Sequence, residues 1–591
     1  MEGRDFTDIF ARPKLWVPIA WIGAMLYFLF DRWGLIRAFA LSDTDDNMRI
    51  MQVRGLLSGQ GWFDLRQYRL DPPLGADIHW SRLVDLPIAG IRLLLQPILG
   101  GPGAEQAAAA LAPMLPMGVA ILAVALIAQR MIAPKALLLG LLLLACAHTA
   151  RAMWMPMRID HHGWQLALLA LTMVGLTDPN KRRGGAIAGL ATAASLTIGL
   201  ELLIYLAVAG AVIGLAWVID GKRERLAAYG ITLGGGCAVG FLLFASYANR
   251  AAVCDALSPV WLSMMLLAGA LCVLLSQITL SSWSLRLALG VAAALVLAGF
   301  YVWAWPDCLG RLEHVSPEAQ RLWLNNVREA RPIYRQSGAA IATFVSLPIT
   351  GLVGYAAMIW RNRRDGDRLI GWAGLATLAA TSAGLLLWQT RAGPAASLLA
   401  VPGATGLGWL LLLAIHRSKS VLVRVGSSVV AFLLLSGVGT QIVVGWAVKN
   451  NQANPRGTAI AKANSRCPTM VALHPIALQP KGYVLTFVDL APRLITVTHH
   501  DAVIGPYHRN DAAIADVMES FIGTPDRALQ TVRRRHIDYV LICPNLSEST
   551  NYQARAPNGF YAQLAKGQAP GWLSPIALPK NSPYKMWRVI G

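Results

Sequence analysis

Long apolar runs recur along most of the chain, and many are near the length that crosses a lipid bilayer. A helix needs about 20 apolar residues to cross the hydrocarbon core. Such runs begin near Leu15 and continue to Trp446. They predict about thirteen membrane spans. The expected ranges are 15–40, 107–129, 134–150, 161–177, 184–198, 200–219, 227–246, 259–277, 287–305, 339–360, 369–388, 395–415 and 426–447.

Two apolar stretches allow more than one interpretation. The stretch at 184–219 fits either one tilted helix or two short ones, and 86–99 is a further stretch in or on the membrane. The span count is therefore open by about two.

The last part of the chain lacks runs of this length. Strand-like segments lie at 483–488, 493–498 and 539–543, with a helical stretch at 511–535. This alternation is typical of a small α/β unit. We therefore predict a polytopic α-helical membrane domain over 1–447, followed by a soluble α/β domain over 448–591.

Composition excludes a soluble protein. Hydrophobic residues make up 55% of the chain and charged residues 14%, and the mean hydropathy is +0.48. A soluble surface needs more charge than this. The formal net charge is +20, but no basic stretch carries interleaved aromatic residues, so nucleic-acid binding is not expected.

The basic residues indicate the orientation, because Lys and Arg collect in cytoplasmic connections. They lie at 130–135, 181–183, 222–225, 286, 361–368 and 417–424. With the N-terminus on the same side, an odd number of spans places residues 448–591 outside. The two long loops at 41–86 and 306–338 are then outside as well.

The cysteines divide by this topology. Cys146, Cys237 and Cys272 fall in predicted spans, where a thiol behaves as a small apolar group. Cys254 and Cys308 lie in consecutive outward loops, and Cys467 and Cys543 lie in the outward domain. Each outward pair is a candidate disulfide in an oxidising compartment.

An acidic cluster directly follows the first apolar run. It comprises Asp43, Asp45 and Asp46, with Arg49 close behind. Carboxylates packed at a membrane boundary repel one another and lose hydration. They are therefore stabilised by a bound cation, by basic side chains, or by water around a solvent-exposed loop. A second polar group, Arg158-Ile159-Asp160-His161-His162, is expected on the same side.

This second group has the side chains of a cation site. Asp160 and His162 converge on one ion only if the backbone is irregular there, because residues two apart do not share a helical face. Carboxylates with one imidazole favour Mn²⁺ or Mg²⁺ over structural zinc. On its own, such a group of polar residues at the end of a span more often lies at the membrane interface without binding an ion. Together with the acidic cluster and Glu329, it indicates a cation site.

Several short motifs occur in a particular order: Asp43-(x5)-Arg49, Pro73-x-Gly75, His79-Trp80-(x4)-Asp85, Arg130 before the third span, and Asp160-His161-His162. In this order they resemble the catalytic-subunit family of oligosaccharyltransferases, which are integral-membrane glycosyltransferases of the GT-C class. The resemblance implies a GT-C fold and an outward C-terminal domain. It also implies a divalent cation held by Asp43, Asp160, His162 and Glu329.

One segment departs from the family. The family marks its peptide-acceptor pocket with Trp-Trp-Asp-Tyr-Gly at the start of the soluble domain. The corresponding segment here, Phe487-Val488-Asp489-Leu490-Ala491, keeps only the Asp. Recognition of a small hydroxyl depends on placed polar groups. We therefore expect an acceptor other than the Asn-x-Ser/Thr sequon.

Further residues are candidates for binding substrate. Arg391 and Arg49 are expected at the donor phosphate, although an interfacial Arg reaching toward water explains Arg391 about equally well. Glu201, between two short spans, is expected to be structural rather than to line the cavity. Acceptor contacts are expected at Asp489, Tyr507, His508 and Arg509.

Together these features predict an inverting glycosyltransferase. It would move a sugar from a polyprenyl-phosphate or polyprenyl-diphosphate donor to a lipid, polysaccharide or other glycan. The cation would neutralise the leaving phosphate. Asp43 first, or Glu329 second, would take the acceptor proton, with Asp45 or Asp46 as substitutes for Asp43. We expect a monomer in a bacterial inner membrane, with its site on the periplasmic side.

Other functions remain as alternatives. Within the class these are a protein oligosaccharyltransferase, a lipid A or aminosugar-type transferase, and an inactive assembly subunit. A lipid or glycan transporter belongs to another class. It would carry charges in mid-span, whereas the predicted spans are almost free of charge.

Overall fold

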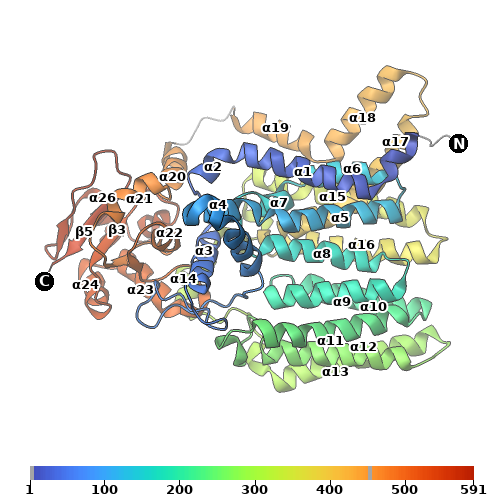
Figure 1. Cartoon of the computed structure of the whole chain (residues 1–591), viewed down its shortest axis with the longest axis horizontal. Helices are drawn as coiled ribbons and strands as arrows, with labels where there is room; N and C mark the ends of the chain where they lie inside the picture. The colour runs from blue at the N-terminus through green and yellow to red at the C-terminus, as the bar shows by residue number, and fades with distance from the viewer. Residues whose placement is uncertain (1–5, 450–454, 591) are drawn as a thin grey trace.

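The computed structural model describes residues 6–449 and 455–590. The membrane domain is a bundle of roughly parallel helices, and the C-terminal domain covers one end of it (Figure 1). The first long loop, with helices α3 (Thr44–Leu57) and α4 (Asp85–Leu111), lies between the two domains.

Every predicted span lies on a helix. Eight helices are long and apolar enough to cross a membrane, or up to ten if each bent pair counts as one span. The stretch at 184–219 forms two helices. The bundle helices are α1 (Pro13–Asp31), α2 (Trp33–Arg37), α5 (Met114–Met131), α6 (Ala136–Cys146), α7 (His148–Arg151), α8 (His162–Leu176), α9 (Lys181–Ile198), α10 (Leu203–Asp220), α11 (Glu224–Phe244), α12 (Pro259–Gln277), α13 (Trp283–Ala304), α15 (Gly338–Arg361), α16 (Gly366–Leu385), α17 (Gly393–Ile415), α18 (Val421–Leu435) and α19 (Val438–Lys449).

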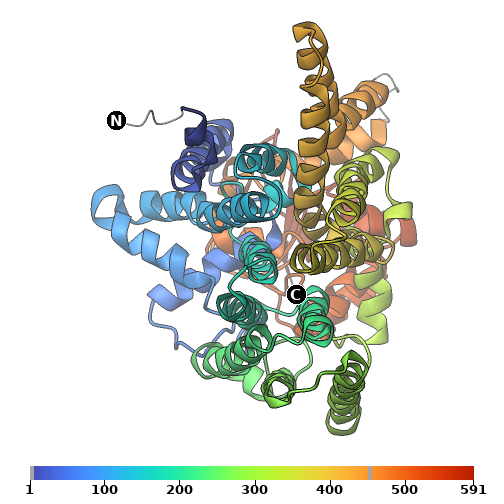
Figure 2. The same ribbon diagram turned by 90° about the vertical axis from the view of Figure 1, so that its right-hand side faces the viewer.

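Glycines allow the closest helix pairs to approach. Seen end-on in Figure 2, the bundle helices form a packed group from which α18 projects. A methyl group added at Gly354 of α15 would lie 1.9 Å from the carbonyl oxygen of Gly403 in α17. Small residues bring membrane helices together in this way, because apolar burial does not drive their association in lipid.

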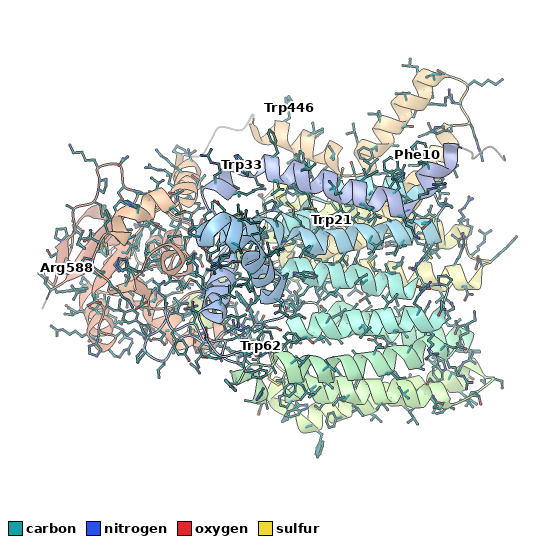
Figure 3. All side chains as sticks on the ribbon, in the orientation of Figure 1. Phe10, Trp21, Trp33, Trp62, Trp446 and Arg588 are labelled. Carbon is teal, nitrogen blue, oxygen red and sulfur yellow. A yellow bond between two sulfur atoms is a disulfide. The ribbon has the colours of Figure 1, made fainter. Side chains whose placement is uncertain are left out.

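The two ends of the bundle differ in side chains. At one end, Lys181 and Lys222 both pair with Asp367, which joins three of the predicted basic connections. At the other end, nearest the C-terminal domain, lie Trp33, Trp62 and Trp446, with Phe10 far from them (Figure 3). Aromatic side chains prefer the membrane–water interface.

The extra apolar stretch at 86–99 belongs to α4. This helix is broken at Gly100, whose φ of 70° is left-handed. Leu93, Leu94 and Ile98 in its first half are exposed. An exposed apolar helix next to the bundle is consistent with the expectation that this stretch lies in or on the membrane.

The second long loop is mostly irregular. It holds α14 (Pro317–Leu322) followed by single turns of 3-10 helix. Short 3-10 helices also occur in other connections. The 3-10 segments are η1 (Phe6–Ala11), η2 (Ala152–Trp154), η3 (Ala248–Arg250), η4 (Pro306–Cys308), η5 (Leu324–Asn326), η6 (Arg328–Ala330), η7 (Ile333–Arg335), η8 (Thr390–Ala392) and η9 (His508–Asn510).

The C-terminal domain is built on one five-stranded sheet with the order β2-β1-β3-β5-β4. Strand β1 is parallel to β2 and β3, whereas β5 is antiparallel to β3 and β4. The strands are β1 (Tyr483–Leu485), β2 (Asp501–Ala502), β3 (Tyr539–Ile542), β4 (Leu573–Pro575) and β5 (Lys585–Val589). The helices are α20 (Pro455–Arg466), α21 (Met470–Ala477), α22 (Ala491–Val497), α23 (Asp511–Ile522), α24 (Pro525–Arg534), α25 (Ser549–Arg555) and α26 (Phe560–Lys566).

The predicted strand at 493–498 is wrong, because this segment is part of α22. Pro492 stands in the first turn of the helix, where its missing N–H costs nothing. The helix packs against α3 of the first loop. This contact outweighs the β preference of Ile495, Thr496 and Val497.

The first long loop is bonded to the edge of this sheet. Leu70 pairs in parallel with Ala502 of β2. The guanidinium of Arg69 donates to the carbonyl oxygens of Ile495, Thr498 and His500 and pairs with Asp501. The C-terminal domain is thereby fixed onto the first long loop of the membrane domain.

Both predicted cysteine pairs are bonded. Cys254 is joined to Cys308 and Cys467 to Cys543. The other three cysteines, at 146, 237 and 272, are free. The first disulfide connects the loops after α11 and α13, and the second connects the end of α20 to the residue after β3.

Candidate active site

The acidic cluster forms the start of α3. Asp43 caps the helix, since its Oδ1 accepts a hydrogen bond of 2.6 Å from the backbone N–H of Thr44. Asp45 and Asp46 occupy the first turn. Carboxylates are stabilised there by the unpaired N–H groups and the helix dipole. The cluster is thus a helix terminus as well as a group of charges.

Asp46 attaches the second polar group to this helix. Its Oδ1 accepts hydrogen bonds from the backbone N–H groups of Ile159 and Asp160, at 2.7 and 2.9 Å. The preceding residue, Met157, has a left-handed φ of 72°. A bulky residue in this region is uncommon and strained. The turn it makes directs Arg158 toward the carboxylates.

Arg158 lies among three carboxylates. One nitrogen, Nη1, is 2.8 Å from Asp43 Oδ2 and 3.9 Å from Asp46 Oδ2. The other, Nη2, is 2.7 Å from Asp160 Oδ2. Burial would raise the pKa of Asp160, but Arg158 and the neighbouring histidines hold it below its ordinary value. Burial and the other acids raise the pKa of Asp46.

Asp45 is different from its neighbours. The removal of water and then the charge of Asp43 raise its pKa to about 7. Its side chain is partly exposed, and no ion pair holds it within the described chain. A carboxylate that titrates near neutral pH is suited to accept a proton.

The two histidines face different groups. His161 Nε2 is 2.7 Å from Glu201 Oε1, and the other oxygen of Glu201 accepts from Gln165 Nε2 at 2.6 Å. His162 begins α8, and its N–H donates to Asp160 Oδ1 at 3.0 Å. The backbone before His162 is irregular, as convergence of Asp160 and His162 on one ion requires.

Glu329 and Arg391 form a pair at the edge of this group. Arg391 Nε donates to Glu329 Oε1 at 3.1 Å. Burial would raise the pKa of Glu329, but Arg391 and, more weakly, His162 and Arg158 hold it below its ordinary value. Glu329 is therefore ionised and close enough to His162 to affect it.

The residues present fit a divalent cation in part. Asp46 Oδ2 is buried and receives no hydrogen bond, and Asp160 Oδ2 has only its ion pair with Arg158. However, the four predicted ligands are not gathered into one coordination shell, because Arg158 pairs with Asp43 and Asp160 and Arg391 with Glu329. In the described residues, a different group, His79, Asp255 and His508, has three ligand atoms within 4.8 Å of one another.

Arg49 lies beneath the site rather than at its surface. Its side chain is buried, with Nη1 2.8 Å from Asp85 Oδ1 and the guanidinium 4.4 Å from the ring centre of Trp80. Trp80 in turn contacts the rings of His161 and Tyr507. In this position Arg49 supports the site through Asp85 and Trp80.

Two of the predicted acceptor residues face the acidic cluster. Tyr507 is buried, and its hydroxyl is 3.3 Å from the carbonyl oxygen of Thr44. Removal of water, Glu548 and Asp43 all raise the pKa of Asp489, which places Asp489 within the influence of the cluster.

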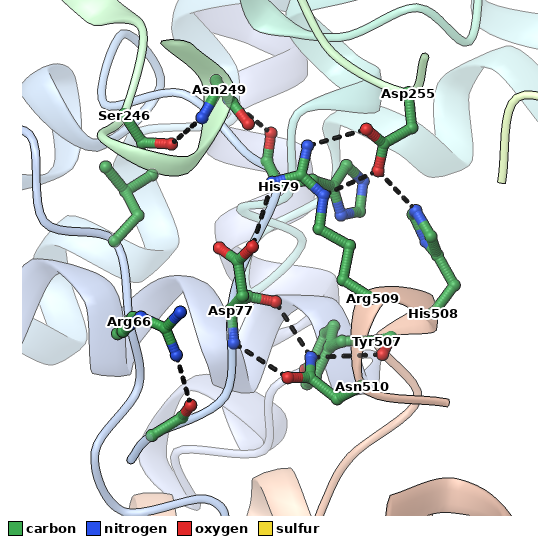
Figure 4. A network of polar contacts seen from close by, with 12 residues as sticks. Arg66, Asp77, His79, Ser246, Asn249, Asp255, Tyr507, His508, Arg509 and Asn510 are labelled. Atoms are coloured by element: carbon green, nitrogen blue, oxygen red, sulfur yellow. Dashed lines mark hydrogen bonds and ion pairs between the residues drawn. The ribbon is translucent and has the colours of Figure 1, made fainter. Parts of the chain in front are cut away.

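The other two predicted acceptor residues, His508 and Arg509, form ion pairs with the membrane domain (Figure 4). His508 Nε2 is 2.7 Å from Asp255 Oδ2. Arg509 donates to both oxygens of Asp255, at 2.8 and 2.7 Å, and to Asp77 at 3.2 Å. These contacts hold the domain in place. Asp255 was missed by the sequence analysis, because a single Asp in a short loop carries no pattern.

The segment that departs from the family motif is mainly core. Phe487, Val488, Leu490 and Ala491 are buried, and the Phe487 ring contacts Phe521, Tyr552 and Tyr561. The neighbouring Glu548 accepts from the N–H groups of residues 488 and 489. Apart from Asp489, these side chains offer no polar group to a ligand.

Comparisons with known proteins show which fold this is. No family model matches the chain, and no curated protein matches it. The archaeal oligosaccharyltransferase AglB from Archaeoglobus fulgidus, solved with an inhibitory peptide and a dolichol-phosphate, has a TM-score of 0.66 at 15% identity. The match covers 95% of this chain and 73% of that chain.

Other structures of the Archaeoglobus fulgidus oligosaccharyltransferase agree. The apo form has a TM-score of 0.67 at 15% identity, again covering 95% and 73% of the two chains. The complex with Zn and sulfate has a TM-score of 0.61 at 13% identity, with 94% and 71% covered. The chain therefore has the GT-C fold of these oligosaccharyltransferases.

Proposed function

We propose that the protein is a glycosyltransferase that uses a sugar linked to a polyprenyl phosphate or diphosphate. The observation that carries the proposal is the carboxylate group around Arg158, placed where the helix bundle meets the C-terminal domain of an oligosaccharyltransferase-like fold. The dolichol-phosphate in the AglB complex supports a lipid-linked donor.

In this proposal the two arginines at the site bind the donor. The charges of Arg158 and Arg391 both act on Glu329, and the two guanidiniums would hold the phosphate as the bond from the sugar C1 to the phosphate oxygen breaks. Asp43, Asp160, His162 and Glu329 are the residues that would hold a divalent cation, Mn²⁺ or Mg²⁺, and that cation would neutralise the charge of the leaving phosphate.

The acceptor proton goes to a carboxylate. Asp43 and Glu329 are both in ion pairs, which makes them weak bases. Asp45 has no such partner in the described structure and titrates near neutral pH. We assign it as the proton acceptor. The acceptor oxygen then attacks the sugar C1 from the face opposite the phosphate, with inversion.

The acceptor is the second part of the proposal. A protein that recognises the sequon needs side chains that form hydrogen bonds with its small hydroxyl group. The corresponding segment here, 487–491, instead packs the ring of Phe487 into the core of the domain. This supports a lipid, polysaccharide or other glycan as acceptor. Protein glycosylation is the second candidate, supported by the inhibitory peptide bound to AglB.

Surface glycans provide the test. A deletion strain is complemented with the wild type, with Asp160→Asn, or with Asp526→Asn, an exposed and distant control. Mass spectrometry is expected to show a glycan that returns with the wild type and the control but not with Asp160→Asn. Equal amounts of this glycan in all strains would exclude the proposed glycosyltransferase activity.

The purified chain separates the acceptors and the cation. Lipid-linked sugar from the same membranes is offered with a sequon peptide or with extracted glycan, with and without a chelator. We expect labelled glycan, unlabelled peptide and loss of turnover on chelation. A labelled peptide would establish protein glycosylation. Turnover that is unchanged by the chelator would show that the reaction does not need the cation.

A further inference from the structure

Three separate segments bring metal-binding side chains together at the domain junction. His79 comes from the first long loop, Asp255 from the connection after α11, and His508 from η9 of the C-terminal domain. One ligand atom from each lies within 4.8 Å of the others. Figure 4 shows the three side chains converging. The group is separate from the carboxylates around Arg158.

The loops that carry these side chains are fixed. Asp255 directly follows Cys254, which is disulfide-bonded to Cys308. The side chains of Asp255 and His508 are 8% and 11% exposed. The rings of His79 and His508 are 4.5 Å apart. A group held this firmly loses little conformational entropy when it takes up a ligand.

One of the side chains has an unused nitrogen. His79 Nδ1 is buried and has no hydrogen-bond partner, which is unfavourable for a polar atom unless a ligand satisfies it. An imidazole nitrogen that carries no proton has the free electron pair that a metal ion needs.

The surrounding charges favour a cation. Asp255 and Asp77 supply two negative charges, and Arg509 supplies one positive charge. The hydrogen bonds of Arg509 occupy one electron pair on each Asp255 oxygen. The second pair on Oδ2 is in contact with His508 Nε2 at 2.7 Å, and it becomes available to an ion when the ion replaces this hydrogen bond.

We propose that His79, Asp255 and His508 bind a divalent transition-metal ion of the zinc type. Two imidazoles and one carboxylate, with a position left for water, are a common zinc donor set. Zinc–nitrogen distances are about 2.0–2.1 Å, so the hydrogen bond between His508 and Asp255 must open to admit the ion. The ion joins the first loop, the disulfide-linked loop and the C-terminal domain at one point.

Zinc content of the full-length protein in detergent tests the proposal. The chain is stripped with a chelator, dialysed against zinc, and its bound metal is counted. His79→Phe and His508→Phe keep the ring volume and remove the nitrogens. Each is expected to bind about one zinc ion fewer than the wild type. His499→Phe, at an exposed histidine of the same domain, is the control and should bind as much as the wild type.

Thermal unfolding gives an independent measurement, because an ion that binds the folded chain raises Tm. Zinc should raise the Tm of the wild type, the His499→Phe control and Asp160→Asn, but not that of His79→Phe. Equal zinc content and equal Tm shifts in His79→Phe and wild type would overturn the proposal. Loss of zinc binding in Asp160→Asn alone would overturn it too, and would place the ion at the proposed glycosyltransferase site.

If both Phe variants fail to fold, a spectrum of the wild-type chain with cobalt(II) still tests the proposal. Cobalt(II) substituted for zinc should give the visible absorption of a four-coordinate site, and the same bands should appear in Asp160→Asn. Their absence from the wild type would overturn the proposal.

Discussion

At the scale of single residues, Arg158 determines the charge state of the site. It supplies positive charge to Asp43 and Asp160, which come from separate segments of the chain. Without a counter-charge, carboxylates this close could not all ionise. Arg158 therefore takes the place that the sequence analysis reserved for a cation, and a cation would have to displace it from at least one carboxylate.

Asp45 provides a prediction of pH dependence. Its pKa of about 7 means that it is protonated below neutral pH and ionised above it. If it accepts the proton, turnover rises as the pH increases through about 7 and then levels off. Asp45→Asn should slow turnover by about 10²–10⁴-fold and remove this limb of the pH profile. The measurement is the rate of sugar transfer across pH.

Asp526→Asn is the matched control, because Asp526 also lies in the first turn of a helix but far from the site. It should keep the rate and the pH profile of the wild type. An Asp45→Asn variant with an unchanged profile would show that another group takes the proton.

The sequence named most of the polar residues at the site but not their partners. The backbone N–H of His162 reaches the Asp160 carboxylate because the chain is irregular before α8. The burial of Arg49 against Asp85 could not be foreseen, since a charged side chain in a loop is ordinarily exposed. His79 and Asp255 meet only through the fold, and no local pattern connects them.

At the scale of elements, glycine contacts fix the distance between α15 and α17. The space for a Cβ at Gly354 is taken up by the backbone of Gly403, so only glycine allows this approach. Arg391 lies in η8 (Thr390–Ala392), which leads into α17. The packing of α15 against α17 therefore affects where the Glu329–Arg391 pair lies.

Gly354→Ala should separate these helices and lower stability by about 1–3 kcal/mol, as overpacking does. Thermal unfolding in detergent measures the effect. Gly299→Ala on α13 is the control, because no atom lies within 4 Å of the added methyl group. Equal stability of the two variants would contradict the close packing of α15 and α17.

The sequence predicted elements well where one physical requirement dominates. Long apolar runs form helices, so the positions of most of these helices were readable from the sequence. The described residues contain eight to ten candidate spans rather than the thirteen expected. The segment at 493–498 was misjudged because its β-branched residues suit a strand, while its contact with α3 is set by the tertiary structure. The helix expected at 511–535 is divided into α23 and α24 by Gly523 and Pro525.

At the scale of the whole molecule, the first long loop holds the two domains together. Arg69 alone reaches three carbonyl groups at the end of α22, as well as Asp501. Arg54 reaches a fourth, that of Thr496, and Arg493 returns to Asn47 of α3. These contacts place the C-terminal domain over the acidic cluster.

Arg69→Ala should loosen this junction. Hydrogen bonds to a charged group contribute about 1.5–3 kcal/mol, so backbone hydrogen exchange in α22 should become about 10-fold faster or more. Hydrogen–deuterium exchange with mass spectrometry measures it. Arg66→Ala is the control, because Arg66 bonds only to carbonyls of its own loop, at Leu74 and Gly75. Unchanged exchange in the Arg69 variant would show that other contacts suffice.

The pairing of Leu70 with Ala502 also determines how this protein can be divided for experiments. Strand β2 is the outermost strand of the sheet, and the loop supplies its missing neighbour. A fragment that starts after residue 454 would leave the backbone groups of β2 unpaired and Tyr507 uncovered. Open strand edges promote aggregation. A recombinant C-terminal fragment therefore needs residues 41–86 fused to it, or it will self-associate.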